Sequence, residues 1–138
     1  GFGKTLVLKV FMEILKGIPY SKFPKGYALR SCNDVVIDFN LKGAESYHRQ
    51  LKAGNYLYDD FGTEREGKFY GSTENVMKII LEERYNLFID ENKITHLTSN
   101  LNLDQINERY GFRVASRIPE MFNTIVVNSE VRFLGITN

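Results

Sequence analysis

The chain is 138 residues long, 43% hydrophobic and 25% charged, and its net charge is only +1. The length fits one domain with a real hydrophobic core, and the composition is ordinary for a soluble globular protein. No apolar run approaches the length that spans a bilayer, so we expect no membrane partner, and the small net charge excludes a chain-wide nucleic-acid-binding surface.

Charge and cysteine content give two further hints. Residues 1–52 hold nine Lys/Arg and four Asp/Glu, whereas residues 53–138 hold nine Lys/Arg and thirteen Asp/Glu. This asymmetry favours contact between the first half and an anionic partner. The single cysteine, Cys32, cannot form an internal disulfide and indicates a reducing compartment such as the cytoplasm.

The chain opens with G-F-G-K-T, Gly1–Thr5, the second half of a phosphate-binding loop, G-x-x-x-x-G-K-[ST]. In such a loop, glycine N–H groups surround the phosphates, the lysine reaches the β- and γ-phosphates, and the hydroxyl binds Mg²⁺. Gly3, Lys4 and Thr5 fit the last three positions. We therefore expect the motif's first glycine, and the strand before it, to precede residue 1. A chain cut there should bind nucleotide weakly by itself. The alternative is a Gly-rich turn beside a surface lysine.

Hydrophobic periodicity predicts helices and strands in alternation along the chain. A helix that starts directly at G-K-T suits phosphate binding, because its N-terminus offers free N–H groups. Pro119 is expected to stop the last helix. This alternation predicts an α/β fold with a mainly parallel sheet in one domain, residues 1–138. In chain order the predicted elements are helix Thr5–Leu15, strand Tyr27–Cys32, helical pieces in Asn33–Lys52 broken near Gly43, strand Asn55–Asp60, helix Thr73–Asp90, strand Thr95–Ser99, helices Leu103–Tyr110 and Arg113–Ile118, and strands Thr124–Asn128 and Arg132–Ile136.

A second motif is Y-L-Y-D-D, Tyr56–Asp60. A hydrophobic strand that ends in an acid is how a protein with a phosphate-binding loop holds Mg²⁺ opposite its threonine hydroxyl (the Walker B motif). The adjacent acid can then polarise the attacking water as a general base. The alternative is an ordinary solvated strand end, because paired acids are common in turns.

Two later motifs leave their roles open. The strand T-H-L-T-S-N, Thr95–Asn100, ends in polar residues that either cap the helix after it or orient a water molecule beside the γ-phosphate. Arg113 and Arg117, four residues apart, share a helical face. They form either a solvated surface pair or an arginine finger that a neighbouring subunit uses to stabilise the transition state.

Together the four motifs resemble the DnaC/DnaI/IstB group of AAA+ ATPases, which are bacterial helicase loaders and transposition helpers. They occur in the order G-x-G-K-T, hydrophobic-D-D-F-G-x-E, T-S-N-L and E-R-x-G-x-R-V-x-S-R, and the resemblance covers nearly the whole chain. In this sequence they read Gly1–Thr5, Leu57–Glu64, Thr98–Leu101 and Glu108–Arg117, with Tyr110 inserted in the last.

The resemblance implies a P-loop NTPase: a three-layer α/β/α domain, truncated at its N-terminus, whose first strand is missing from this chain. It implies ATP and Mg²⁺ as cofactors, with a replicative DNA helicase and single-stranded DNA as partners, and self-assembly through Arg113. A transposition helper or a P-loop kinase is the alternative. The implied roles are nucleotide binding for Gly1, Gly3, Lys4 and Thr5, Mg²⁺ binding for Thr5 and Asp59, general base for Asp60 (Glu64 next), sensor 1 for Asn100, finger for Arg113 and, loosely, C-terminal sensor for Arg132.

Overall fold

The computed structural model describes residues 2–17, 27–52 and 54–126, and all structural statements refer to these. Helices and strands alternate over most of this length, as predicted. In chain order they are α1 (Phe2–Gly17), β1 (Tyr27–Ser31), α2 (Cys32–Lys42), α3 (Glu45–Lys52), β2 (Asn55–Phe61), β3 (Gly67–Phe69), β4 (Ser72–Glu74), α4 (Val76–Glu91), β5 (Thr95–Ser99), α5 (Leu103–Tyr110) and α6 (Phe112–Met121).

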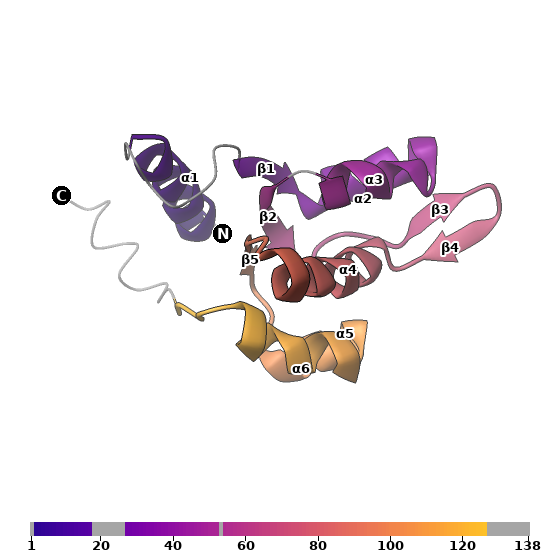
Figure 1. Cartoon of the computed structure of the whole chain (residues 1–138). Coiled ribbons are helices and arrows are strands. Elements are labelled where there is room, and N and C mark those ends of the chain that lie inside the picture. The colour runs from indigo at the N-terminus through magenta and orange to yellow at the C-terminus, as the bar shows by residue number, and fades with distance from the viewer. Residues whose placement is uncertain (1, 18–26, 53, 127–138) are drawn as a thin grey trace.

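The main sheet is parallel and has three strands in the order β1-β2-β5. Figure 1 shows α1 on one side of this sheet and α2, α3 and α4 on the other, with α5 and α6 beyond α4. The predicted α/β class and the parallel sheet are therefore confirmed. In a parallel sheet all strands end at the same edge, so the residues that follow β2 and β5 meet there.

The central strand β2 is buried on both faces, in keeping with the hydrophobic run Tyr56–Tyr58 before its two acids. Tyr56 and Tyr58 face the core that the sheet shares with α2 and α4, and their rings stack 5.4 Å apart. The alternate residues face α1. On that side His96, which pairs with Leu57 in the sheet, packs its ring edge-on against Phe11 of α1.

Local capping fixes where the helices begin. Ser31 caps α2 by accepting a hydrogen bond from the Asp34 N–H at 3.0 Å. Asn102 and Gln105 form a reciprocal capping box at the start of α5, with both bonds at 2.9 Å. The cap of α5 is therefore Asn102, so the capping alternative for the residues that end the T-H-L-T-S-N strand is wrong.

Several predicted elements differ from the structure, and the first is α1, which begins at Phe2 rather than at Thr5. The helix expected over Thr73–Asp90 begins only at Val76, because Ser72–Glu74 pairs with Gly67–Phe69 in an antiparallel hairpin. At the tip, Tyr70 and Gly71 both have positive φ, and the Tyr70 side chain is 95% exposed. Figure 1 shows this hairpin projecting away from the main sheet.

The last helix and the strand after it also differ. Pro119 does not stop α6, which continues to Met121. A proline this close to a helix end removes one N–H bond without breaking the helix, and the Phe122 N–H still bonds to the Ile118 carbonyl at 3.0 Å. Residues 124–126 form no strand, and the remainder of that predicted strand, like Arg132–Ile136, lies outside the described residues.

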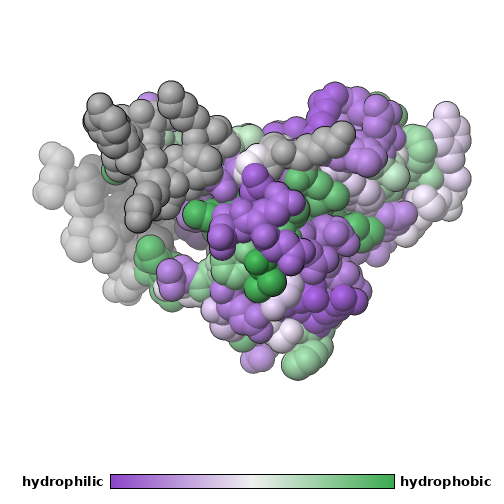
Figure 2. Space-filling model, in the orientation of Figure 1, coloured by the Kyte–Doolittle hydropathy of each residue, from purple (hydrophilic) through white to green (hydrophobic). Residues whose placement is uncertain are grey.

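The described surface is mostly hydrophilic on the face shown in Figure 2, with hydrophobic side chains in separate small patches. None of the helices in the described part of the chain combines the length and apolar character needed to cross a membrane.

Candidate functional site

The first and second motifs meet in the structure. The Thr5 hydroxyl, in the first turn of α1, donates a hydrogen bond to Oδ2 of Asp59 at 2.8 Å, although 54 residues separate them. The other carboxylate oxygen of Asp59, Oδ1, accepts a hydrogen bond from the Thr98 hydroxyl on β5. Asp59 is 9% exposed, so a helix and a neighbouring strand fix this buried carboxylate from two sides.

An irregularity in β2 lies at the two acids. Tyr58 pairs with Leu97 and Phe61 pairs with Ser99, so three steps along β2 match two steps along β5. The extra residue is accommodated at Asp59 and Asp60, opposite Thr98. Asp60 has a φ of +60°, and its N–H donates to the Thr98 hydroxyl at 3.0 Å. Such a bulge re-aims side chains that a regular strand would send to opposite faces.

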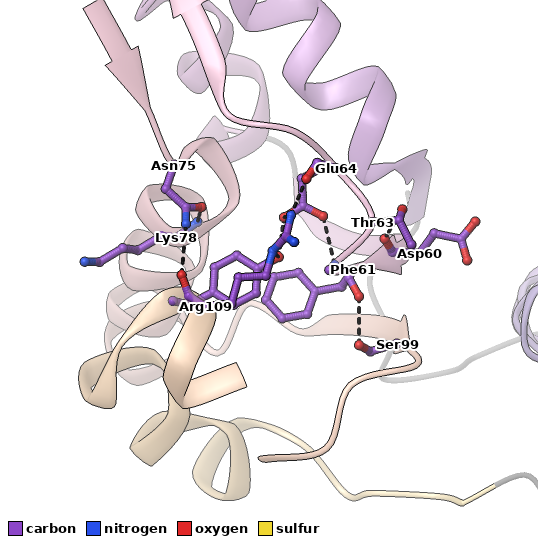
Figure 3. Close-up of polar contacts among 10 residues, drawn as sticks. Asp60, Phe61, Thr63, Glu64, Asn75, Lys78, Ser99 and Arg109 are labelled. Atoms are coloured by element: carbon purple, nitrogen blue, oxygen red, sulfur yellow. Dashed lines mark hydrogen bonds and ion pairs between the residues drawn. The ribbon is translucent and has the colours of Figure 1, made fainter. Parts of the chain in front are cut away.

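The Asp60 carboxylate is half-buried, whereas that of Glu64 is enclosed. Figure 3 shows Asp60 pointing away from Glu64 and its neighbours. Both carboxylate oxygens of Glu64 are occupied, one by the Gly62 N–H at 2.8 Å and the other by the Tyr110 hydroxyl. Of the two, Asp60 is therefore the better placed to reach water, and Glu64 is unsuited to act as a base.

The carboxylates give this edge of the sheet a negative potential. Cys32, fully buried at the start of α2, lies close enough to interact electrostatically with these carboxylates. Burial raises the pKa of its thiol, and the carboxylates of Glu64, Asp59 and Asp60 raise that pKa further. The thiol therefore stays protonated near neutral pH and is a poor nucleophile. The same negative potential favours a bound cation.

Asn100 and Asp59 lie near the ends of neighbouring strands. Asn100 is exposed immediately after β5, and Asp59 is close to the end of β2. Gly3 and Lys4 lie in the first turn of α1, next to Thr5, and both are partly buried. Gly1 lies outside the described residues.

The two arginines of α6 have different surroundings. Arg113 is exposed, whereas Arg117 is partly buried, with its guanidinium 4.2 Å from the centre of the Tyr85 ring and one N–H donating to the Glu82 carbonyl at 3.5 Å. The environment of Arg117 is that of an anchor between α6 and α4, and Arg113 is the freer of the two to meet another molecule. Arg132 lies outside the described residues.

The sequence interpretation missed Thr98. Its hydroxyl contacts both acids, by donating to the Asp59 carboxylate and accepting from the Asp60 N–H. The available signal was alternation along the strand, because Thr98 and Asn100 are two residues apart and share a face. Reading that signal correctly also required knowing that the Thr95–Ser99 strand pairs with Asn55–Phe61.

The donor set at Asp59 fits Mg²⁺. The Thr5 and Asp59 oxygens are 2.8 Å apart, and adjacent ligands of an octahedral ion bound at about 2.1 Å lie roughly 3 Å apart. Within the ranges that the structure describes, His, Cys, Asp and Glu form no group of three or more that could hold a metal ion. Thr5 and Asp59 would therefore hold Mg²⁺ together with phosphate oxygens and water, as is usual for this ion.

Comparisons of the chain with models of protein families, with curated proteins and with solved structures return no match. Function is therefore inferred from the motifs and the geometry of this chain alone.

Proposed function

We propose that the protein is a Mg²⁺-dependent ATPase that acts as a loader of a replicative DNA helicase. The observation that carries this proposal is the hydrogen bond between Thr5 and Asp59 at the carboxyl edge of a parallel sheet. Ligands in open α/β sheets bind at this edge. A threonine that follows Gly-Lys at a helix start and an acid that follows a hydrophobic strand are the two protein ligands of Mg²⁺ in P-loop ATPases.

The residues divide the work in the following way. Lys4 and the N–H groups around Gly3 bind phosphate, and Thr5 and Asp59 hold the metal ion that neutralises phosphate charge. Asp60, which is half-buried beside them, accepts a proton from the attacking water. The exposed Arg113 is offered to a neighbouring subunit. The helicase partner and single-stranded DNA rest on the family resemblance of the four motifs.

Calorimetric titration of the full gene product with Mg²⁺-ATP tests nucleotide binding. We expect Lys4→Ala to weaken ATP binding about tenfold to a hundredfold, because a charge-assisted hydrogen bond contributes about 1.5–3 kcal/mol. Lys9→Ala, an exposed lysine of the same helix, is the matched control and should bind as the wild type does. Equal ATP affinity in the wild type and Lys4→Ala would overturn the proposal.

DNA binding separates the loader from its family alternative. In the presence of Mg²⁺-ATP, we expect a fluorescent single-stranded oligonucleotide to bind more tightly than the same sequence as a duplex. The reverse preference would favour a transposition helper that acts on duplex DNA.

A further inference from the structure

Glu64 is a buried carboxylate with partners on two different elements. Its side chain is 3% exposed, although it lies in the loop that follows β2. One oxygen accepts the Gly62 N–H within the loop, and the other accepts the Tyr110 hydroxyl from α5. Arg109 adds its guanidinium, which donates to the Glu64 carbonyl and lies 3.9 Å from the same carboxylate oxygen. Figure 3 shows the Arg109 side chain lying beside Glu64.

On one side, this cluster is joined to the acidic end of β2. Thr63 bonds to the Asp60 carbonyl through both its N–H and its hydroxyl, at 3.2 and 2.8 Å. Ser99 of β5 donates to the Phe61 carbonyl at 2.7 Å. Gly62 has a φ of +100°, and a Cβ there would lie 2.5 Å from Leu101. The segment from Asp60 to Glu64 is therefore a compact turn closed by its own hydrogen bonds.

On the other side, the cluster is joined to the junction between α5 and α6. Arg109 and Tyr110 are the last two residues of α5, and only Gly111 separates them from α6. The Tyr110 ring stacks on Phe61 with centroids 4.3 Å apart. The exposed Arg113 is the second residue of α6. Tyr110 therefore lies directly before the helix whose first turn carries Arg113.

We propose that Glu64 is a positioning residue that couples the acidic end of β2 to the α5–α6 junction, so that occupancy of the site at Asp59 is transmitted to the surface around Arg113. If the loop moved away from α5, it would leave a buried carboxylate without its donors, which is unfavourable. The loop and the junction therefore move together. The transmission of occupancy rests on the proposed ATPase function, whereas the coupling itself does not.

Amide hydrogen exchange of the full gene product, measured without nucleotide, tests the coupling. Tyr110→Phe removes only the hydroxyl that meets Glu64 and keeps the ring on Phe61. We expect exchange to accelerate about tenfold or more both in residues 61–66 and in residues 109–113, and to stay unchanged in β1. Faster exchange at residues 109–113 alone, or at neither segment, would overturn the coupling.

Two further variants make this result specific. Tyr47→Phe is the matched control, because Tyr47 also donates to a glutamate, Glu74, at 2.8 Å, but between α3 and β4; it should leave both segments unchanged. If Tyr110→Phe also accelerates exchange in β1, the variant is globally loosened. Arg109→Met then decides, because this half-exposed side chain can be replaced without burying a new polar group. It must accelerate both segments for the proposal to stand.

Adding Mg²⁺-ATP separates this inference from the proposed function. In the wild type we expect slower exchange at both segments, and in Tyr110→Phe slower exchange at residues 61–66 only. A wild type that responds at residues 61–66 but not at 109–113 would overturn the transmission and leave the ATPase proposal intact. A wild type that responds at neither segment would overturn the ATPase proposal and the transmission with it, while the nucleotide-free measurement still decides the coupling.

Discussion

Asp60 occupies a backbone conformation that few residues adopt readily. Its φ of +60° lies in the left-handed region, where Asp and Asn are among the better tolerated side chains. The Thr98 hydroxyl accepts its N–H, and the Thr63 N–H bonds to its carbonyl. These bonds therefore fix the Asp60 main chain, and with it the direction of the Cα–Cβ bond, independently of any ligand.

This conformation makes Asp60→Asn a clean test of the general base. Asparagine tolerates the same φ and has the same shape, so the fold and ATP binding should be preserved, but its amide cannot accept the proton of the attacking water. We expect ATP turnover to fall about 10²-fold or more, measured as phosphate release under saturating Mg²⁺-ATP. Asp104→Asn, an exposed aspartate of α5, is the control. Equal turnover in wild type and Asp60→Asn would exclude Asp60 as the base.

At the scale of the elements, α4 is held to the sheet by an arginine with no exposed surface. Arg84 is 0% exposed, and burial lowers the pKa of its guanidinium. It donates to the carbonyls of Gly54 at 3.2 Å and Ile94 at 2.9 Å, and to the Thr95 hydroxyl at 2.9 Å. These acceptors lie at the starts of β2 and β5, so one side chain satisfies main-chain groups on two strands.

Replacing this side chain should destabilise the fold even though no acid is among these partners. Arg84→Met keeps the aliphatic length but removes the donor to the Gly54 carbonyl and to the Thr95 hydroxyl, each at a cost of about 1–3 kcal/mol. We expect the free energy of unfolding in denaturant to fall by about 3 kcal/mol or more. Arg49→Met makes the same substitution at an exposed site of α3 and should change it by less than about 0.5 kcal/mol. Similar effects for the two variants would mean that the Arg84 bonds contribute nothing net.

The elements that could be predicted from sequence are those with clear periodicity or capping. Strand Thr95–Ser99 and helix Leu103–Tyr110 have the predicted bounds, and for the helix the signal is local, because Gly111 closes it. The hairpin was missed because each strand is only three residues long, too short for alternation to be seen. Met121 lies beyond the predicted stop, because Pro119 removes a single bond in the last turn.

The contacts of the candidate site also divide into those that could be predicted from sequence and those that could not. The approach of Thr5 to Asp59 followed from two motifs with known partners. The contacts of Thr98 and Glu64 could not be predicted, because they span 39 and 46 residues and depend on an irregular pairing of strands and on helix packing. Local sequence patterns do not show which residues far apart in the chain will be in contact.

At the scale of the whole molecule, the exposed Arg113 lies on α6, which packs against α4 and α5. A finger that acts on a neighbouring subunit should matter little for ATP affinity and much for turnover, because its charge is needed only in the transition state. We expect Arg113→Ala to bind ATP normally, and to lose most of an activity that in the wild type rises steeply with protein concentration.

Mixing two inactive variants tests this arrangement. Lys4→Ala offers an intact Arg113, and Arg113→Ala offers an intact phosphate-binding site, so the mixture should recover part of the wild-type turnover. Arg117→Ala replaces Arg113→Ala in a parallel mixture. Because Arg117 is anchored on Tyr85, it should not act on a neighbouring subunit. We therefore expect the mixture of Lys4→Ala and Arg117→Ala to recover no turnover. Equal turnover in Arg113→Ala and wild type over a wide concentration range would exclude the assembly and favour a kinase that acts alone.

The β3–β4 hairpin has a consequence for how this chain can change in evolution. Its base is fixed to α2, where the Lys68 N–H bonds to Asn40 at 2.6 Å, and Phe69 lies against Gly43. Its tip touches little, because a Cβ on Gly71 would meet no atom within 4 Å and Tyr70 is 95% exposed. Exposed loop tips are where insertions and deletions are tolerated. Lineages that carry this domain can therefore lengthen, shorten or replace the tip, and acquire new partners there, without displacing the acids at the end of β2.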